Sequence, residues 1–538
     1  MNSRPGLIVS LAAMAWLIAA AATAACAPTP VQVNVLTFHN DNSRSGYNSH
    51  ETILRHSNVN STTFGKLFSY PVDGYLYAEP LYVSQLAIPG QGTHNVVYAA
   101  SEHDSVYAFD ADGLVATPLW QKSFIDPASG ITTVDALIDV GCAFLVPEIG
   151  ITGTPVISLQ NHALYVVSEV KNQNTGKYII ELHALDLATG SEKFGGPVPI
   201  SATVSGHGIG NDGHGHVSFA PKLANQRPAL LLSGGMVYVA FASNCDIGAY
   251  HGWVMAYDDA TLVQKAIFNS TPNGSEGGIW QSGNGPSASQ YGNIFIGIGN
   301  GTFNANQPNP TDYGDSFVKL NPQLRVMDYF TPSNQAAMAA ADEDGGITGA
   351  VLLPGQQFGP TAFELMGGVK TGRFYLLNRG PMGHFCSACN DSQAIGIVDT
   401  GFGLFDAPAF AKGLVYIGGV GARLKAWQVF NGRMSAGPVA KSATAFAYPG
   451  TSPAVSSNGG FQAIVWALDV SGYASGKPAV LRAYWAFNLS ELYNSAQASG
   501  SRDTAGPAVK FTVPTIANGK VYVGSQTELD VYGLLPTP

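Results

Sequence analysis

The sequence predicts an all-β fold, a β-propeller of four-stranded blades, and three observations predict it. A β unit recurs along the chain, one repeat phase runs through nearly all of it, and turn residues are spread evenly. The clearest copy is NVVYAASEHDSVYAFDADGLVATPLW at 95–120, where two β-prone runs flank a polar turn and a second turn precedes an aromatic-ended strand. Further copies of this unit, with diverged sequences, begin near residues 165, 237, 293, 415 and 521. A β unit that repeats every ~40–50 residues is typical of propellers.

The first 25 residues are typical of an export signal, and we expect a secreted or periplasmic bacterial protein. Arg4 precedes an apolar run at 7–22, and Ala22-Thr23-Ala24 offers a small-residue cleavage site. Later apolar runs are shorter than the ~18 residues of a membrane-spanning helix. Thr-Ala-Ala-Cys, ending at Cys26, resembles a lipoprotein processing site without the usual Leu three residues before the cysteine. A lipid anchor at Cys26 is therefore an alternative to free secretion.

After the signal, residues 26–63 are expected to form an N-terminal segment that packs on the ring, and 64–538 one propeller domain. Phe64–Val72 is a strand candidate without a hairpin partner before it, and Lys520–Leu535 is one strand short of a blade. We expect the two to pair and close the ring, which leaves no sheet edge free.

Eight short apolar runs are predicted as the inner strands of eight blades. They are 80–82, 155–157, 229–232, 286–288, 351–354, 408–410, 453–455 and 514–516. Seven blades remain an alternative because the fifth copy, at 346–383, is the least regular. Long insertions at 121–150, 201–226, 301–315, 331–363 and 384–402 are expected to gather on one face, where propellers bind their ligands.

Charge and cysteine content exclude several classes of function. The 26 basic and 36 acidic residues give a net charge of −10 without basic clusters, which excludes a nucleic-acid-binding protein. Besides Cys26 the chain has four cysteines: Cys142, Cys245, Cys386 and Cys389. Three connectivities are open, of which Cys386–Cys389 is the simplest pairing. A zinc site lacks a second close ligand pair, and Asn390 stands where c-type haem attachment needs His.

The most informative constellation lies at 275–332. It contains GGIW at 277–280, GIGN at 297–300, Gly314-Asp315 and Thr331-Pro332, in this order. In these motifs the sequence resembles the quinoprotein alcohol dehydrogenases, exported eight-bladed propellers that hold pyrroloquinoline quinone (PQQ) and calcium on their axis. More broadly it resembles secreted PQQ-repeat proteins of unestablished function.

The resemblance implies roles for four residues. Trp280 would stack on the quinone, Asn300 would offer its amide oxygen to calcium, and Lys370, in VKTGRFYLLNR at 369–379, would reach the cofactor. Glu169 is a distant counterpart of the calcium-binding glutamate. Each retained residue also has a structural alternative: Trp280 as core, Asn300 as a turn residue, Lys370 as a solvated hairpin lysine.

Two departures speak against catalysis. The family's catalytic aspartate lies five residues after Thr-Pro, where this chain has Ala337, and no catalytic residue is assigned. A general base contributes a factor of ~10²–10⁴, so its loss would be severe. Asp342 and Asp344 lie nearby in sequence, without support for a substitute role. The family's adjacent cysteine pair is also missing, because Ala143 follows Cys142.

Two polar loops complete the candidates. HGIGNDGHGH at 207–216 could bind a transition metal, although its glycines leave the ligands unpositioned. NDNSRSG at 40–46 resembles the entry segment of the same dehydrogenases, where it packs on the ring. The first functional hypothesis is thus a non-catalytic propeller that binds a small-molecule or protein ligand at its loop-rich face. The alternative is a divergent PQQ- and calcium-dependent alcohol or sugar dehydrogenase.

Overall fold

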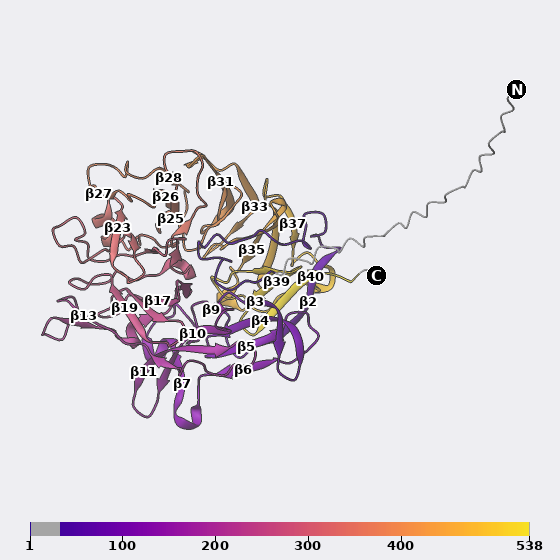
Figure 1. Cartoon of the computed structure of the whole chain (residues 1–538), viewed down its shortest axis with the longest axis horizontal. Coiled ribbons are helices and arrows are strands. Elements are labelled where there is room, and N and C mark those ends of the chain that lie inside the picture. Colours follow the sequence, from indigo (N-terminus) through magenta and orange to yellow (C-terminus); the bar gives the residue numbers. More distant parts are fainter. Residues whose placement is uncertain (2–32, 537–538) are drawn as a thin grey trace. The chain divides into compact units, whose positions relative to one another are not determined.

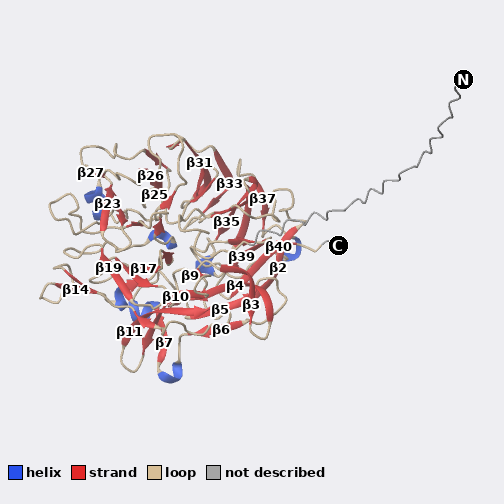
Figure 2. Cartoon of the chain, in the orientation of Figure 1, coloured by secondary structure: helices blue, strands red, loops and turns tan. Residues whose placement is uncertain are grey.

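The chain folds into a closed ring of eight β-sheets around a central axis (Figures 1 and 2). The computed structural model describes Met1 and residues 33–536; the predicted signal peptide from residue 2 on, and Cys26, lie outside the described residues. Each sheet is built on four antiparallel strands and is called a blade, numbered from the first complete repeat. The predicted all-β propeller with eight blades is confirmed.

Blades 1 to 4 follow the chain from residue 81. Blade 1 consists of β3 (Leu81–Ile88), β4 (Gly92–Ser101), β5 (Ser105–Asp110) and β6 (Trp120–Ser123), and blade 2 of β9 (Val156–Ser158), β10 (Ala163–Asn172), β11 (Lys177–Asp186) and β12 (Val198–Pro199). Blade 3 consists of β16 (Leu231–Ser233), β17 (Met236–Ser243), β18 (Trp253–Asp258) and β19 (Gln264–Asn269), and blade 4 of β20 (Ser287–Ala288), β21 (Ile294–Gly297), β22 (Phe317–Leu320) and β23 (Val326–Thr331).

Blades 5 to 8 repeat the pattern, and blade 8 borrows one strand from the start of the chain. Blade 5 consists of β24 (Val351–Leu352), β25 (Glu364–Gly368), β26 (Arg373–Asn378) and β28 (Gly396–Asp399), and blade 6 of β29 (Ala409–Ala411), β30 (Leu414–Ile417), β31 (Ala422–Phe430) and β33 (Ala440–Phe446). Blade 7 consists of β34 (Ala454–Asn458), β35 (Phe461–Asp469), β36 (Val480–Trp485) and β37 (Glu491–Asn494), and blade 8 of β38 (Thr515–Ala517), β39 (Lys520–Gly524), β40 (Glu528–Leu534) and β2 (Phe64–Pro71).

Short additional elements decorate the blades. They are the strands β1 (Tyr47–Asn48), β7 (Ile131–Asp135), β8 (Glu148–Ile149), β13 (Thr203–Ser205), β14 (His216–Ser218), β15 (Ala224–Asn225), β27 (His384–Phe385) and β32 (Arg433–Met434), and the helical turns η1 (Pro127–Ser129), η2 (Ala136–Val140), η3 (Pro221–Leu223), η4 (Gln281–Gly283), η5 (Tyr473–Ser475) and η6 (Ser499–Ser501). Within the described residues the one α-helix is α1 (Gln335–Ala340).

Each of the eight predicted inner strands overlaps the first strand of a blade, so these predictions are confirmed. These strands could be recognised from local sequence, because each is a short apolar run between turn residues. Such a run can bury both of its faces only between two neighbouring blades. Every residue of β5 is buried for this reason. Aromatic side chains fill the space between blades: Phe64 of blade 8 lies 5.5 Å from Trp466 of blade 7, measured between ring centroids.

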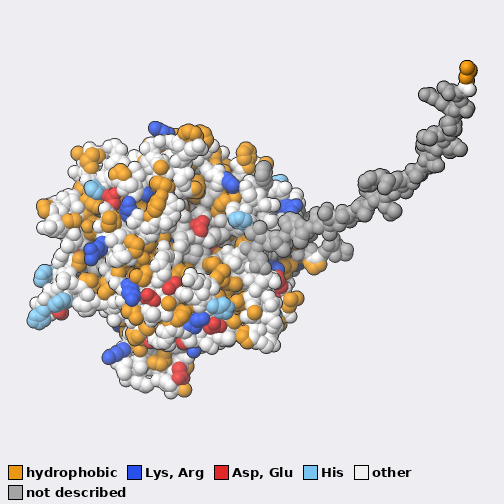
Figure 3. All heavy atoms as spheres, in the orientation of Figure 1, with side chains coloured by type: hydrophobic (Ala, Val, Ile, Leu, Met, Phe, Trp, Pro, Cys, Tyr) orange, Lys and Arg blue, Asp and Glu red, His pale blue; other side chains and the backbone are white. Residues whose placement is uncertain are grey.

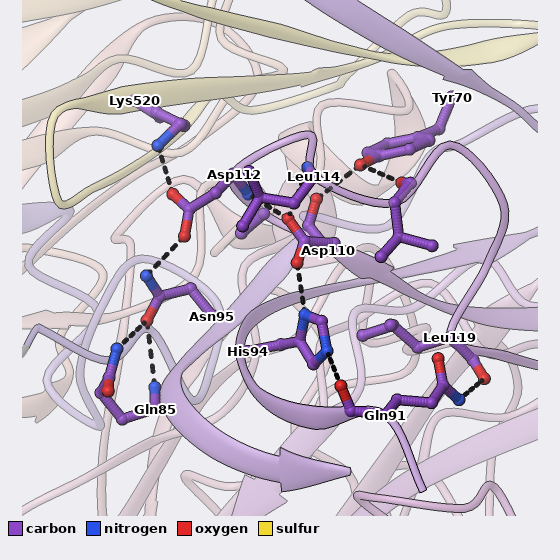
Figure 4. Close-up of polar contacts among 12 residues, drawn as sticks. Tyr70, Gln85, Gln91, His94, Asn95, Asp110, Asp112, Leu114, Leu119 and Lys520 are labelled. Atoms are coloured by element: carbon purple, nitrogen blue, oxygen red, sulfur yellow. Dashed lines mark hydrogen bonds and ion pairs between the residues drawn. The ribbon is translucent and has the colours of Figure 1, made fainter.

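The ring is closed as predicted by the two ends of the domain. β2 pairs antiparallel with β40 from Phe64–Leu534 to Pro71–Glu528. Blade 8 then contacts blade 1 through the Asp-Ala-Asp-Gly turn of the first repeat (Figure 4). Lys520 Nζ donates to Asp112 Oδ1 at 2.6 Å, and the Tyr70 hydroxyl donates to the Asp110 carbonyl at 2.6 Å. These carboxylates therefore have a structural role at the closure.

Because consecutive strands are antiparallel, turns alternate between the two faces of the ring. We call the site face the one that carries the turns between second and third strands and the connections between blades. The insertions 121–150, 201–226, 301–315 and the connection 332–350 lie there. The expectation of a single loop face was wrong for blade 5: residues 353–363 and 379–395 follow its first and third strands and lie on the opposite face.

Residues 35–48, here called the axial segment, cross the ring on its axis (Figure 1) and bond to the inner strand of every blade. The bonds, in blade order, are Val35 N to Tyr82 O (2.9 Å), Ile157 N to Leu36 O (2.8 Å), Asn42 Nδ2 to Leu232 O (2.8 Å), Ala288 N to Asn42 O (2.8 Å), Leu352 N to Ser43 O (2.9 Å), Phe410 N to Ser45 O (2.7 Å), Val455 N to Gly46 O (2.7 Å) and Asn48 Nδ2 to Ile516 O (3.0 Å). Inner strands present a free edge to the axis, and the axial segment satisfies part of each edge.

Both disulfides are formed, Cys142–Cys245 and Cys386–Cys389. The simplest predicted pairing is confirmed, and the long-range bond follows from it. Disulfides persist in oxidising compartments, so both fit an extracellular or periplasmic protein, whereas the signal peptide stays a prediction. Over the described range, the structure has no helix with the length and apolar character needed to cross a membrane.

Candidate functional site

The glycine motifs of 277–301 interlock on the site face and bring Trp280 and Asn300 together. Gly277 N donates to the Asn300 carbonyl at 2.7 Å, and Gly299 N donates to the Gly278 carbonyl at 2.8 Å. A Cβ on Gly299 would lie 2.5 Å from Asp344 Oδ1 and 3.1 Å from Cδ1 of Trp280. A side chain at 299 would therefore displace Asp344, and glycine leaves room for Asp344 and Trp280 on the same side of its Cα.

A polar group surrounds this point, which we call the Asp344 cluster: Asn300, Asp342, Asp344 and Lys370. Asn300 N donates to Asp344 Oδ1 and its Nδ2 to Asp342 Oδ1, both at 3.1 Å. Lys370 Nζ lies 2.8 Å from Asp342 Oδ2 and 3.4 Å from Asp344 Oδ2. The cluster joins blade 4, blade 5 and the connection between them, so the fold unites residues 70 positions apart.

Burial distinguishes the two carboxylates. The Asp342 side chain is 62% exposed, but that of Asp344 is 10% exposed. Burial raises the pKa of Asp344 to about 6, although Lys370 and the Asn300 amide lower it. For Lys370, burial lowers the pKa, and the hydrogen bond and charges of Asp342 and Asp344 outweigh this effect and raise it. Asp344 is thus a sheltered carboxylate held by a cation and a backbone amide.

Ala337 does not lie at this point. It is exposed on α1, a short helix that fills the connection after Thr331-Pro332. Asp344 follows the helix, and Asp315 anchors the next residue by accepting a hydrogen bond from Gly345 N at 2.9 Å. Counting residues from Pro332 could not find Asp344, because the helix lengthens the connection. A glycine pair after an acidic run, Asp344-Gly345-Gly346, was the available signal.

Trp280 lies half-buried beside the cluster and contacts one further ring. Phe144, from the connection between blades 1 and 2, lies edge-on to the indole, with ring centroids 5.9 Å apart. The disulfide of Cys142 fixes this connection to blade 3. Lys510 Nζ lies 4.2 Å from the Phe144 centroid, and burial lowers the pKa of this lysine to about 8. The indole of Trp280 is therefore neither fully buried in the core nor fully free to stack on a ligand.

Glu169 is buried on β10, where it pairs with Ile180 of β11 and also contacts blade 1. Its N–H donates to Asp104 Oδ1 at 3.2 Å, and Glu102 is the charge that affects it most. Burial raises the pKa of Glu169 and Asp104 well above their usual range, and that of Glu102 to about 8. Within the described residues, hydrogen bonds and ion pairs do not join Glu169 to Asn300.

Two charged residues deeper on the axis were missed by the sequence reasoning. Arg227 and Asp406 each stand just before an inner strand, and both are buried. Arg227 Nη2 and both Asp406 oxygens lack hydrogen-bond partners in the described part of the chain. Arg227 packs on Phe511, with 4.4 Å from Cζ to the ring centroid. A charge one or two residues before a proline at the start of a predicted inner strand was a usable signal, as in Arg227-Pro228 and Asp406-Ala407-Pro408.

Calcium was predicted at Asn300 and Glu169, and the donor atoms themselves fit. Asn300 Oδ1 and Glu169 Oε1 are both buried without a hydrogen-bond partner among the residues described, and Ca²⁺ takes such oxygens as ligands. Three or more His, Cys, Asp or Glu side chains gathered for a metal are not found over residues 33–536. Asn300 and Glu169 each offer one unpartnered oxygen of the kind that calcium takes, but no hydrogen bond or ion pair among the described residues brings the two oxygens to one point.

The histidine loop of 207–216 lies on a hairpin formed by β13 and β14 at the rim of the ring (Figure 3 shows exposed histidines in pale blue). His207, His214 and His216 are exposed. His216 Nδ1 pairs with Asp212 Oδ2 at 3.1 Å, and Asp212 Oδ1 accepts two backbone N–H groups. Asp212 therefore shapes the turn, and the predicted metal site is not assembled among the described residues.

Comparisons with known proteins show the fold. No protein-family model and no curated protein matches the chain. Among solved structures, a quinohemoprotein alcohol dehydrogenase from Comamonas testosteroni is 16% identical, with a TM-score of 0.60 over 96% of this chain and 82% of that one. A europium-containing methanol dehydrogenase is 13% identical, with a TM-score of 0.60 over 93% and 98%. A quinohemoprotein alcohol dehydrogenase from Pseudomonas putida is 14% identical, with a TM-score of 0.58 over 94% and 82%. This chain has the fold of the quinoprotein dehydrogenases.

Proposed function

We propose that this protein is an exported, quinone- and calcium-dependent dehydrogenase that oxidises an alcohol or sugar hydroxyl, with Asp344 as the proton acceptor. One observation carries the proposal: Asp344 contacts Asn300 and Lys370 and lies on the same side of Gly299 as Trp280, three residues that the motifs had selected without it. The two disulfides and the predicted signal peptide support export. Recovery of the chain from the cytoplasm with an uncleaved N-terminus would contradict that part.

The residues present fit a flat anionic cofactor beside a cation. The indole of Trp280 offers a surface for stacking, and Asn300 Oδ1 with Glu169 Oε1 offers unpartnered oxygens to calcium. Lys370 presents a positive charge at the same point. PQQ, when bound, supplies the acceptor for the hydride of the alcohol carbon.

Asp344 provides the complementary proton chemistry. Its Oδ2 lies 3.4 Å from Lys370 Nζ, and this cation offsets part of the effect of burial, so that with a pKa of about 6 the carboxyl is mostly ionised at neutral pH. An ionised carboxylate in a sheltered site can take the hydroxyl proton of the substrate. Asp342, which is exposed, bonds both Asn300 and Lys370 and thereby fixes their orientation.

The experiment is a titration with PQQ and Ca²⁺, followed by tryptophan fluorescence, together with a dye-linked assay over primary alcohols and sugars. We expect saturable quenching that Trp280→Ala removes. Asp344→Asn should keep the binding but lower kcat about 10²- to 10⁴-fold, the share of a general base. Asp399→Asn, at an exposed position of blade 5, is the matched control and should change neither. Absence of quinone binding with calcium present would refute the proposal.

The contact between Phe144 and Trp280 favours a second function, a non-catalytic protein that binds a small molecule or a protein at the site face. Here the indole is already partly used by an aromatic neighbour. The same titration separates the two functions. Binding of quinone without turnover of any tested hydroxyl, in wild type and Asp344→Asn alike, would support the non-catalytic function.

A further inference from the structure

The face opposite the candidate site holds a pocket that the proposed function does not use. It lies between blades 4 and 5 and has a volume of about 300 Å³. The residues that define it, here called the Arg379 pocket, are Ser289, Tyr291, Phe295, Lys319, Phe363 and Arg379. They come from the first turns of blades 4 and 5, from β21 and β22 near that face, and from the residue that follows β26. A pocket of this volume suits a small organic molecule.

Aromatic side chains form the rim and floor of the pocket. Tyr291 and Phe363 meet edge to face, with centroids 6.2 Å apart, and are 69% and 37% exposed. Phe295 is buried below them. Exposed rings at a pocket mouth offer apolar contact to a flat ligand at little cost in side-chain entropy.

Two cations lie in the same pocket. Arg379 packs on Phe363, with 5.2 Å from Cζ to the ring centroid, and donates Nη2 to the Leu353 carbonyl at 2.9 Å. Its buried Nε has no hydrogen-bond partner among the described residues. Lys319 Nζ donates to the Arg379 carbonyl at 2.9 Å, which leaves two of its three donors.

Acceptors for these donors are scarce around the pocket. Asp and Glu are absent from its described lining, and Ser289 Oγ is also buried without a partner. Glu364, whose two carboxylate oxygens are buried without a hydrogen-bond partner, affects Arg379 electrostatically from outside the lining, but neither a hydrogen bond nor an ion pair joins the two within the described residues. A guanidinium that stacks on a ring and keeps a free donor edge is suited to a carboxylate.

We propose that the Arg379 pocket is a binding site for a small organic anion with an aromatic ring, independent of the candidate site on the other face. The anionic group pairs with Arg379 and Lys319, and the ring lies between Tyr291 and Phe363. The two sites are on opposite ends of the blades, so one can be occupied without the other.

The test uses 2-naphthoate as the probe and isothermal titration calorimetry on the full chain. We expect one naphthoate per chain, with the neutral 2-naphthamide and the cationic 2-naphthylmethylamine at least about tenfold weaker. Arg379→Met should weaken naphthoate about 10- to 100-fold, and Lys319→Met less. Arg379→Lys, which keeps the charge, should retain more affinity than Arg379→Met and guards against a folding defect.

Two controls fix the location. Arg423→Met removes an exposed arginine of blade 6, and Lys370→Met removes the cation of the candidate site; neither should alter naphthoate binding. Loss of binding in Lys370→Met alone would place the anion on the site face and overturn the proposal. Equal affinity for naphthoate and naphthamide, or unchanged affinity in the Arg379→Met/Lys319→Met variant, would overturn it as well.

Discussion

Arg44 on the axial segment and Arg227 on the connection before blade 3 are both buried, and burial lowers the pKa of each guanidinium to about 10. Their surroundings differ. Arg44 makes five hydrogen bonds, to Thr37 Oγ1, Phe38 O, Leu230 O and, twice, Pro286 O. Arg227 keeps an unpartnered Nη2 and rests on Phe511.

The difference in hydrogen bonding between Arg44 and Arg227 separates a structural role on the axial segment from a binding role toward the site face. On the axial segment the buried charge of Arg44 is matched by backbone carbonyls at the start of blades 3 and 4, so it ties the segment to both blades. Toward the site face, buried Arg227, Asp406 and Glu169 keep donor and acceptor atoms unused. Unused buried polar atoms are costly, and a bound ligand or ordered water can satisfy them. Buried charged groups toward the site face therefore keep atoms that a ligand could use, whereas the Arg44 guanidinium of the axial segment has no donor left.

The largest expected effect compares the two arginines directly. Arg44→Met leaves the acceptors from residues 37, 38, 230 and 286 buried without a donor, so we expect the free energy of unfolding to fall by about 3–5 kcal/mol. Arg227→Met removes a poorly matched charge of similar volume, and we expect a change of about 1 kcal/mol or less. Thermal and urea unfolding of both variants provide the measurement. A loss in Arg227→Met as large as in Arg44→Met would remove the distinction between the two ends.

The next effect concerns His39, which is buried on the axial segment with both ring nitrogens unpartnered among the described residues. Burial, aided by Arg44, lowers its pKa from 6.5 to about 3. The unfolded chain therefore binds a proton that the folded chain refuses between pH 6.5 and 3, so stability falls as the pH falls through this window. At pH 5 this group costs about 2 kcal/mol relative to pH 8.

His39→Asn removes the titration and suits the positive φ of 52° at this residue. We expect its urea midpoint to fall less than that of wild type between pH 8 and 5. His50→Asn, at an exposed position, is the control and should follow wild type. Parallel pH profiles for wild type and His39→Asn would mean that the axial segment opens to admit the proton.

Much of the fold could be predicted because its signals are local. An apolar run such as 155–157, between turn residues, identifies an inner strand without knowledge of its neighbours. The closure by Phe64 and Lys520 followed from counting strands. The axial segment was expected to pack on the ring, but its contact with all eight inner strands was not foreseeable. Those hydrogen bonds join residues up to 468 positions apart. Nothing in the polar sequence at 40–46 indicates which residues it bonds.

The sequence singles out the site candidates that a motif marks and gives no role to those that only the fold places. Trp280, Asn300 and Lys370 stand in recognisable motifs, whereas the sequence offers Asp344 only as a nearby residue, and its place beside them follows once α1 is known to lengthen its connection. Arg227 and Asp406 belong to separate blades, and only the ring brings their charges near enough for each to affect the pKa of the other. The prediction that all long insertions lie on one face was wrong for blade 5. Its insertions follow the first and third strands, and such turns lie on the opposite face.

The smallest expected effect tests how fully the site face is prepared for a ligand. Phe144 contacts Trp280 edge-on, and such aromatic pairs contribute about 0.5–1.5 kcal/mol. If a stacked quinone must displace this contact, Phe144→Ala should tighten quinone binding by about two- to tenfold in the fluorescence titration. Phe487→Ala removes an exposed ring and should leave the affinity unchanged. Weaker binding in Phe144→Ala would instead make Phe144 the second wall of the cofactor site, and the connection held by Cys142–Cys245 would then be part of the binding machinery.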